Sequence, residues 1–349
     1  MNKKTTLRDI SAELGLSTAA VSKALRGLNG ISEETRKAVI AVARKRNYKG
    51  IANASMETGA PAGKVLLLVD QRYMTEPHTV SAYFFMDQAC KETNFQLSLT
   101  PVPPDNIEDT IREALSDADV VAGVLFGRFP ERLAAPFKAM KKPLFLYDNF
   151  FPYENVDSVK VDDYAGAFLA VEHFVRNGHA RIGFIGDRTL SPAFNDRYRG
   201  FIDAMQYWGL EICEDYVYDL KFVNERGEIE FHLLRDHVDT GKLPTAFFCS
   251  NDPIAIILNN YLKENGIAIP EQVSVIGFDN LETCQWQSPA LTSLHYPRET
   301  IAREMVGLIR WREEHPEAPA KRVMIRPNLI ARQSVMRLDP AESGGGDSQ

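Results

Sequence analysis

A polar run near the amino terminus places small side chains and one lysine on a single helical face. In the segment 17–23, STAAVSK, Ser17 is suited to begin a helix because its hydroxyl can accept a hydrogen bond from the amide of Ala20. The helix would then turn four residues outward: Thr18, Ala19, Ser22 and Lys23. Short side chains let the backbone approach a DNA groove closely, and Lys23 can reach guanine or phosphate. The segment is typical of a recognition helix.

Two further helix patterns would hold this face in place. Residues 7–14 carry apolar side chains at helical spacing, and Gly15 ends that pattern. A third helix begins after Ser32, another residue suited to an N-cap. Apolar residues of the three patterns would form one small core: Leu7, Ile10, Leu14, Val21, Leu25, Val39, Val42 and Ala43. The arrangement predicts a helix-turn-helix, although two-helix corners with this spacing also occur in other helical domains.

Charge separates this segment from the rest of the chain. Residues 1–50 contain eleven Lys and Arg against four acidic residues, a net charge of +7. The whole chain carries −7, so the remaining 299 residues carry −14. A basic amino-terminal segment on an acidic body is expected when one end alone meets nucleic acid.

After residue 64 the chain alternates short apolar runs with helical patterns. Helical segments such as 163–177 repeat apolar residues at Phe168, Val171 and Val175. Most of the apolar runs lack an alternation of period two, as expected of parallel strands covered on both faces: VLLLVD, FQLSLTPV, VVAGVLFG, LFLYD, SVKVDD, RIGFIGD, AFFCSND and VSVIGFDN. The pattern predicts a doubly wound α/β body with parallel sheets.

Four segments are therefore expected. Residues 1–50 form the helix-turn-helix domain and residues 51–63 a hinge or linker. Residues 64–338 form the α/β body, whose length suggests two lobes with chain crossings near residues 160, 290 and 322. The polar tail 339–349 is expected to be disordered.

Several of the predicted strands end in acidic or amide side chains. Ligands of doubly wound folds bind beyond the carboxyl ends of the strands, so these side chains are candidates for a binding site. They are Asp70, Asp148, Asp187, Asn251 with Asp252, and Asp279 with Asn280. A carboxylate at such a position can also cap the following helix, and we favour that interpretation for Asp163 and Asp252.

The sequence lacks the patterns of several other functional classes. It contains no P-loop, GxSxG or HExxH motif and no GxGxxG motif, so we expect neither an enzyme nor a cofactor site. The seven histidines and four cysteines do not follow metal-ligand spacings, so no metal site is expected. No apolar run of about 18 residues exists to span a membrane, and MNKKTT lacks a signal-peptide core, which favours a cytoplasmic protein with reduced cysteines.

Residues 6–48 resemble the DNA-binding headpiece of the LacI/GalR family of bacterial transcription regulators. The segment reads TLRDISAELGLSTAAVSKALRGLNGISEETRKAVIAVARKRNY. The resemblance implies that Thr18, Ala19 and Lys23 read the operator, with only a methyl contact available at Ala19. It further implies contacts to the DNA backbone from Thr6, Ser17, Ser22 and Tyr48.

The segment that follows departs from the family pattern. Gly50 and Ile51 replace the usual Pro-Asn pair, and Glu57 stands where a leucine wedge for the minor groove is expected. Two interpretations follow. Either Met56 is a shifted wedge on a hinge helix, or residues 49–58 are a flexible linker.

The body resembles that of the same family, which has the fold of periplasmic sugar-binding proteins. Matching segments include VEHFVRNGHARIGFIGD (171–187), FFCSNDPIA (247–255) and IPEQVSVIGFDN (269–280). The resemblance implies an effector site formed by Asp148, Arg197, Phe222, Asn251, Asp279 and Tyr296.

Chemically, this set suits a hydroxylated ligand. Arg197 can donate in a fork, Asp148 and Asp279 can accept from paired hydroxyls, and Phe222 can lie against an apolar ring face. Two of these residues have another interpretation. Arg197 could form an ion pair between the lobes, and Phe222 could be an ordinary residue of the hydrophobic core. Tyr296 and Trp286 could line the cleft or pack inside a core.

The resemblance implies a transcription regulator, most often a repressor. The tail AESGGGDSQ contains no leucine heptads, so we expect no tetramerisation helix and a homodimer. It would bind a near-palindromic operator, and a small effector in the interlobe cleft would change its DNA affinity. A sugar is the expected effector, while a purine or a phosphosugar stays open. The alternative is a small-molecule binding or transport receptor without regulatory activity.

Overall fold

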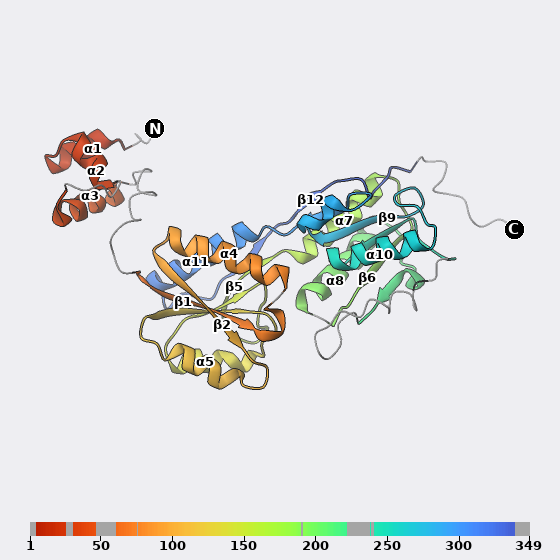
Figure 1. Cartoon of the computed structure of the whole chain (residues 1–349), viewed down its shortest axis with the longest axis horizontal. Helices are drawn as coiled ribbons and strands as arrows, with labels where there is room; N and C mark the ends of the chain where they lie inside the picture. The colour runs from red at the N-terminus through yellow and green to blue at the C-terminus, as the bar shows by residue number, and fades with distance from the viewer. Residues whose placement is uncertain are drawn as a thin grey trace.

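The structure is a computed structural model of the chain. It describes residues 5–25, 31–46, 61–74, 76–189, 191–221, 238 and 241–338. Figure 1 shows a helical amino-terminal domain and two α/β lobes, called lobe 1 and lobe 2 below. Among the described residues, no helix is long and apolar enough to cross a membrane.

The amino-terminal domain consists of α1 (Leu7–Leu14), α2 (Thr18–Leu25) and α3 (Glu33–Lys45). Gly15 ends α1 in the left-handed conformation, with φ of 64°, where a side chain would be strained. The amide of Ala20 donates to Ser17 Oγ at 3.1 Å, and that of Thr35 donates to Ser32 Oγ at 3.2 Å. Both predicted N-caps are therefore confirmed. Six buried side chains form the core between the helices: Ile10, Val21, Ala24, Leu25, Val39 and Ala43.

Lobe 1 contains a six-stranded parallel sheet in the order β11-β5-β4-β3-β1-β2. The strands are β1 (Gly63–Asp70), β2 (Phe95–Val102), β3 (Val120–Phe126), β4 (Leu144–Tyr147), β5 (Asp157–Val161) and β11 (Arg322–Ile325). Helices α4 (Pro77–Glu92) and α11 (Arg298–Glu314) cover one face (Figure 1). Helices α5 (Ile107–Leu115) and α6 (Ala134–Ala139) cover the other. Short 3₁₀ turns lie at Gln71–Tyr73 and Glu131–Leu133.

Lobe 2 contains a second six-stranded sheet in the order β12-β10-β9-β8-β6-β7. The strands are β6 (Ile182–Gly186), β7 (Val217–Asp219), β8 (Ala246–Cys249), β9 (Ser274–Asp279), β10 (Thr292–His295) and β12 (Asn328–Ile330). Helices α7 (Asp163–Arg176) and α8 (Pro192–Tyr207) pack on one face and α10 (Asp252–Glu264) on the other. Further 3₁₀ turns lie at Glu214–Tyr216 and Glu282–Trp286. Only β12 pairs antiparallel among these strands, so this sheet is parallel except at one edge.

The predicted α/β class is confirmed strand by strand. All eight apolar runs are strands, namely β1 to β6, β8 and β9. The predicted helix at 163–177 is α7, but its buried side is not the expected one: Val171 is buried, whereas Phe168 and Val175 are half-buried. Small residues at Gly166, Ala167 and Ala170 take the central positions, because α7 packs closely against α8 and the sheet.

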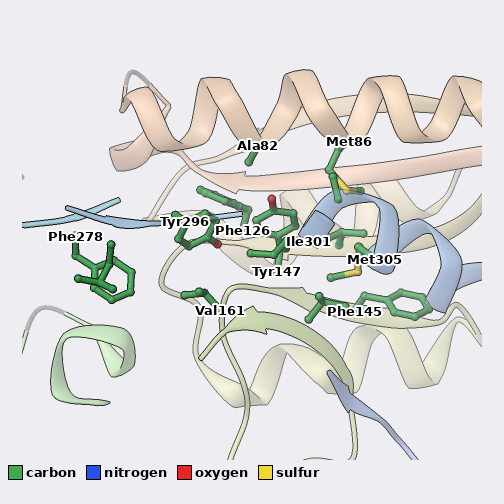
Figure 2. Packing of buried hydrophobic residues seen from close by; sticks show 14 of the residues in the cluster. Ala82, Met86, Phe126, Phe145, Tyr147, Val161, Phe278, Tyr296, Ile301 and Met305 are labelled. Atoms are coloured by element: carbon green, nitrogen blue, oxygen red, sulfur yellow. The ribbon is translucent and has the colours of Figure 1, made fainter. Parts of the chain in front are cut away.

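Within the described residues the chain passes between the lobes at residue 162, at 296–297 and at 326–327. One hydrophobic cluster continues through both lobes, and Tyr296 lies between Phe278 of lobe 2 and Phe126 of lobe 1 (Figure 2). Two helices meet closely at Gly200 of α8, where an added Cβ would lie 2.5 Å from the carbonyl oxygen of Tyr164. The four cysteines are free thiols.

Candidate DNA-binding and effector sites

The outward face of α2 carries the predicted recognition residues. Thr18, Ala19 and Lys23 are exposed, and Ser22 is half-buried. They lie within the first two turns of the helix, so their side chains share one edge. This edge is free of large apolar groups, as close approach to a DNA groove requires.

Two of the predicted backbone-contacting residues also stabilise the local fold. Ser17 caps α2, as described above. The Thr6 amide and hydroxyl both donate to Asp9 Oδ2, each at 2.7 Å, which holds the start of α1. Arg46, just after α3, is paired with Glu13 of α1. Thr6 is exposed, so it can still reach a phosphate.

Three predicted site residues lie outside the described residues: Tyr48, Met56 and Phe222. The wedge and linker interpretations of residues 49–58 also fall outside them, as do the tail 339–349 and residues 1–4.

Arg197 forms the centre of a buried polar cluster in lobe 2. It lies on α8 and is only 3% exposed. Its Nε donates to Asp163 Oδ1 at 2.8 Å, its Nη1 to the carbonyl of Ser250 at 2.5 Å, and its Nη2 lies 3.5 Å from Asp279 Oδ1. The guanidinium also lies 3.6 Å from the centroid of the Phe278 ring. These partners belong to lobe 2, so these contacts are not the predicted ion pair between lobes.

The ion pair between the lobes is made by Lys160, a residue that the sequence did not single out. Lys160 lies at the end of β5 in lobe 1 and is 2% exposed. Its Nζ lies 2.8 Å from Asp196 Oδ2 of α8 and 3.3 Å from Asp163 Oδ2 of α7. An inward-facing lysine in a strand gives no periodic signal, and its closer partner, Asp196, lies 36 residues away in the sequence.

Asp148 forms the lobe 1 side of the same junction. It follows β4 in a left-handed conformation, with φ of 54°. His78 Nε2, at the start of α4, lies 3.7 Å from Asp148 Oδ2, and the ring of His78 meets that of Tyr296 edge-on at 4.5 Å. Three buried polar atoms here have no hydrogen-bond partner among the described residues: His78 Nδ1 and the hydroxyls of Tyr147 and Tyr296. Unsatisfied buried polar atoms in one place are typical of a ligand site.

The cap assignments of two carboxylates were wrong by one residue. Asp162, not Asp163, caps α7 by accepting from the amide of Ala165 at 2.9 Å. Asn251, not Asp252, caps α10 by accepting from the amide of Ile254 at 3.0 Å. Asp252 instead accepts from Ser293 Oγ at 2.6 Å and from the Leu281 amide at 2.7 Å. Asn251, predicted as an effector-site residue, thus uses its side-chain carbonyl oxygen in the capping bond.

The remaining predicted residues separate into two groups. Asp70 and Asp187 accept hydrogen bonds within their own turns, from the amides of Arg72 and Thr189, and so serve the loop. Tyr296 is buried at the junction of the lobes. Trp286 is 66% exposed, so it belongs neither to a core nor to the polar cluster.

Burial raises the pKa of the carboxylates in the cluster, whereas the neighbouring cations lower it. Burial raises the pKa of Asp163 to about 6, even though Arg197 and Lys160 act to lower it. Burial also acts on Asp148, but His78, Lys160 and Arg197 outweigh it and lower the pKa of that carboxyl. The two carboxylates therefore respond differently to pH although they share Lys160 and Arg197.

The two cations of the cluster are more buried than three of its four carboxylates, the exception being Asp163. The side chains of Lys160 and Arg197 are 2% and 4% exposed, whereas those of Asp148, Asp279 and Asp196 are 16%, 19% and 25% exposed. A ligand approaching the junction therefore meets hydrogen-bond acceptors first. This surface suits neutral or cationic molecules with many donors and disfavours phosphates and carboxylates.

A separate pocket of about 460 Å³ lies at the opposite, amino-terminal ends of β4 and β5. It is lined mainly by α6 and by the loop 316–320, and Asp157 and Arg312 pair beside it. None of the predicted site residues lines it. Among the described residues, no group of three or more His, Cys, Asp or Glu side chains is arranged to hold a metal ion.

Comparison with known proteins relates both parts of the chain to transcription regulators. Residues 6–50 match the family of bacterial regulatory proteins of the lacI type, and residues 171–335 match a periplasmic binding protein-like domain. The HTH-type transcriptional repressor PurR of Actinobacillus pleuropneumoniae is 25% identical over 341 residues, covering 96% of this chain and 99% of that protein. PurR of Haemophilus influenzae is 26% identical over 342 residues, covering 95% and 98%.

Solved structures share the fold. A complex of the transcriptional regulator CelR with cellobiose has a TM-score of 0.68 at 23% identity and covers 95% of this chain and 100% of its own. The Lac repressor dimer bound to operator and the anti-inducer ONPF has a TM-score of 0.66 at 17% identity, with 96% and 100% covered.

Fold, headpiece and relatives together define a DNA-binding transcription regulator with a periplasmic-binding-protein-like body. The chain belongs to the LacI family, a family of non-enzymatic regulators, and the predicted family and fold class are confirmed.

Proposed function

We propose that this regulator is a cytoplasmic, homodimeric repressor that binds a near-palindromic operator and is controlled by a donor-rich small molecule, most simply a sugar. The main support is the junction between the lobes, where the part-exposed carboxylates of Asp148, Asp196 and Asp279 lie in front of the buried cations Lys160 and Arg197. Because such a junction changes shape with the angle between the lobes, ligand binding there and headpiece spacing are coupled reciprocally.

Operator binding is tested by selecting bound sequences from random duplex DNA with the full chain. We expect enrichment of a near-palindrome and a steep loss of affinity with added salt. Lys23→Ala should weaken binding to the selected site, whereas Lys91→Ala, which removes an exposed lysine of lobe 1, should not. Selection without any symmetric motif would favour a receptor without regulatory activity.

A dimer interface is supported by the exposed side of α4. Val80, Tyr83 and Phe84 are exposed and recur at helical spacing, so they form one apolar stripe on lobe 1. We expect Phe84→Asp to convert a dimer into monomers in sedimentation experiments and to weaken binding to the two-half-site operator. Tyr153→Asp, at an exposed tyrosine outside this helix, should leave the dimer intact.

The effector is identified by thermal-shift screening of the full chain against sugars and nucleobases. Stabilisation by a sugar supports the proposal, and stabilisation by a purine alone would replace the sugar by a purine as the effector.

Asp279→Asn is the sharpest variant for this site. Asp279 has φ of 108°, and asparagine tolerates positive φ better than most residues, so the fold should be kept while one acceptor is lost. We expect the effector response to disappear and operator binding to persist. Arg197→Ala should also abolish the response, but Arg197 holds Asp163, Ser250 and Asp279 together, so its removal disturbs lobe 2 as well.

A further inference from the structure

A row of aromatic side chains crosses the outer side of α7 and α8 in lobe 2. The ring centroids of Tyr164 and Phe168 are 5.3 Å apart, those of Phe168 and Tyr207 6.0 Å, and those of Tyr207 and Trp208 5.6 Å. Tyr207 is 75% exposed, Trp208 38% and Tyr164 37%. Phe168 is half-buried and packs between the exposed rings and the hydrophobic core. We call these four residues the aromatic patch.

The aromatic patch is unusually apolar for an exposed helix surface. Exposed helix faces are normally polar, and a contiguous apolar surface of a few hundred Å² on a folded protein usually marks an interaction site. With about 150–250 Å² per aromatic side chain, the three exposures above amount to roughly 300 Å². That is a substantial part of the ~800 Å² that each partner buries in an interface of standard size.

Charged residues beside the aromatic patch make it self-complementary. Asp203 of α8 accepts a hydrogen bond from the Tyr164 hydroxyl at 2.8 Å, and Arg199 lies one turn earlier on the same helix. Both residues are exposed. A partner of one charge would meet repulsion from one of these two groups, whereas a second copy turned by a two-fold axis brings Arg199 against Asp203 and Asp203 against Arg199.

We propose that the aromatic patch binds the aromatic patch of a second copy of this chain in a two-fold arrangement. The patch lies on lobe 2, whereas the apolar stripe of α4 lies on lobe 1, so one chain can use both surfaces at once. Dimers formed through α4 would then join into tetramers that hold two operator sites together. The two contacts are separable, since chains that lack the α4 interface would still pair through the patch.

The first test is sedimentation of the full chain without DNA over a range of concentrations. We expect reversible association beyond the α4 dimer. Tyr207→Ser should raise the dissociation constant of that step by about tenfold or more, as for a central aromatic interface residue. The matched control is Tyr153→Ser, because Tyr153 is 92% exposed and lies outside the patch. Equal behaviour of both variants and the unaltered chain would overturn the proposal.

The second test uses charge reversal. Arg199→Asp and Asp203→Arg should each abolish the step alone, because each places like charges opposite one another. An equimolar mixture of the two variants should restore it, since every facing pair is then of opposite charge. Failure of the mixture to associate, with each variant folded by circular dichroism, would contradict the two-fold contact. Phe84→Asp should leave this step in place, so the result does not depend on operator or effector binding.

Discussion

Replacing Lys160 by methionine isolates the ion pair between the lobes. The substitution keeps an unbranched side chain of similar length but removes the ammonium that Asp196 and Asp163 share at 2.8 and 3.3 Å. Removing one partner of a buried ion pair costs about 3–5 kcal/mol. Asp196 is part exposed and can reach water, which reduces the loss.

The size of the remaining loss in unfolding free energy depends on Asp163. It keeps the hydrogen bond from Arg197, and it can also take up a proton, because its pKa is already about 6. Protonating such a carboxyl at pH 7 costs about 1.4 kcal/mol. We therefore expect Lys160→Met to lower the free energy of unfolding by about 2 kcal/mol at pH 7.

The sign of the pH dependence follows from the same group. The folded pKa of Asp163 lies above its ordinary value of 3.8, so its ionisation costs stability as the pH rises through about 6. Without Lys160 the pKa of Asp163 in the folded protein rises further, so ionising Asp163 costs more stability. The free energy of unfolding that Lys160→Met removes should therefore be larger at pH 8 than at pH 5.

Urea unfolding followed by circular dichroism at both pH values measures this difference. The matched control is Lys91→Met. Lys91 is exposed and its partner Asp87 lies one helical turn away, so we expect this substitution to change stability by less than about 0.5 kcal/mol. Asp163→Asn added to Lys160→Met should recover part of the loss. Equal losses at pH 5 and pH 8, or a loss no greater than that of the control, would refute the reasoning.

Three further predictions concern stability elsewhere in the chain. Burial raises the pKa of Asp252 to about 7, above its ordinary 3.8, so ionisation of Asp252 costs stability as the pH rises toward 8. Asp252→Asn should flatten this pH dependence of the unfolding free energy, measured with urea. Parallel pH profiles of the variant and the unaltered chain would contradict this prediction. Gly200→Ala should destabilise the protein by about 1–3 kcal/mol, because the added Cβ would meet the carbonyl of Tyr164. Gly307 lies in an exposed part of α11 with nothing within 4 Å of an added Cβ, so Gly307→Ala should stabilise the protein by about 0.5–1 kcal/mol. Thermal unfolding that orders the two variants the other way would count against this packing. Ser17→Ala should cost α2 about 1 kcal/mol, read as faster amide exchange of Ala20, and unchanged exchange would show that the cap does not hold the helix.

Local rules explain why much of the headpiece and the strands could be predicted. Gly15 ends a helix because only a left-handed residue fits there, and Ser17 caps the next because its hydroxyl meets an amide three residues later. Most of the eight strands were recognisable because a strand covered on both faces is apolar throughout, whereas β2 at the sheet edge carries polar residues. Each of these signals is contained in a few neighbouring residues.

The errors arose where the position of a helix depends on its neighbours. The caps of α7 and α10 lie at Asp162 and Asn251, one residue before the predicted ones. Packing of each helix on its sheet decides where the first turn begins, and a shift of one residue turned two predicted caps, Asp163 and Asp252, into buried partners of other groups.

By itself the sequence determined the charge division between headpiece and body, the class of the fold, and the carboxylates at the strand ends, because composition and short-range periodicity carry that information. Only the tertiary structure decided that Lys160 joins the lobes, that His78 faces Asp148, and that aromatic residues 164, 168, 207 and 208 form one surface. Those groups come from segments far apart in the chain, and electrostatic and packing energies depend on distance in space, which no local pattern encodes.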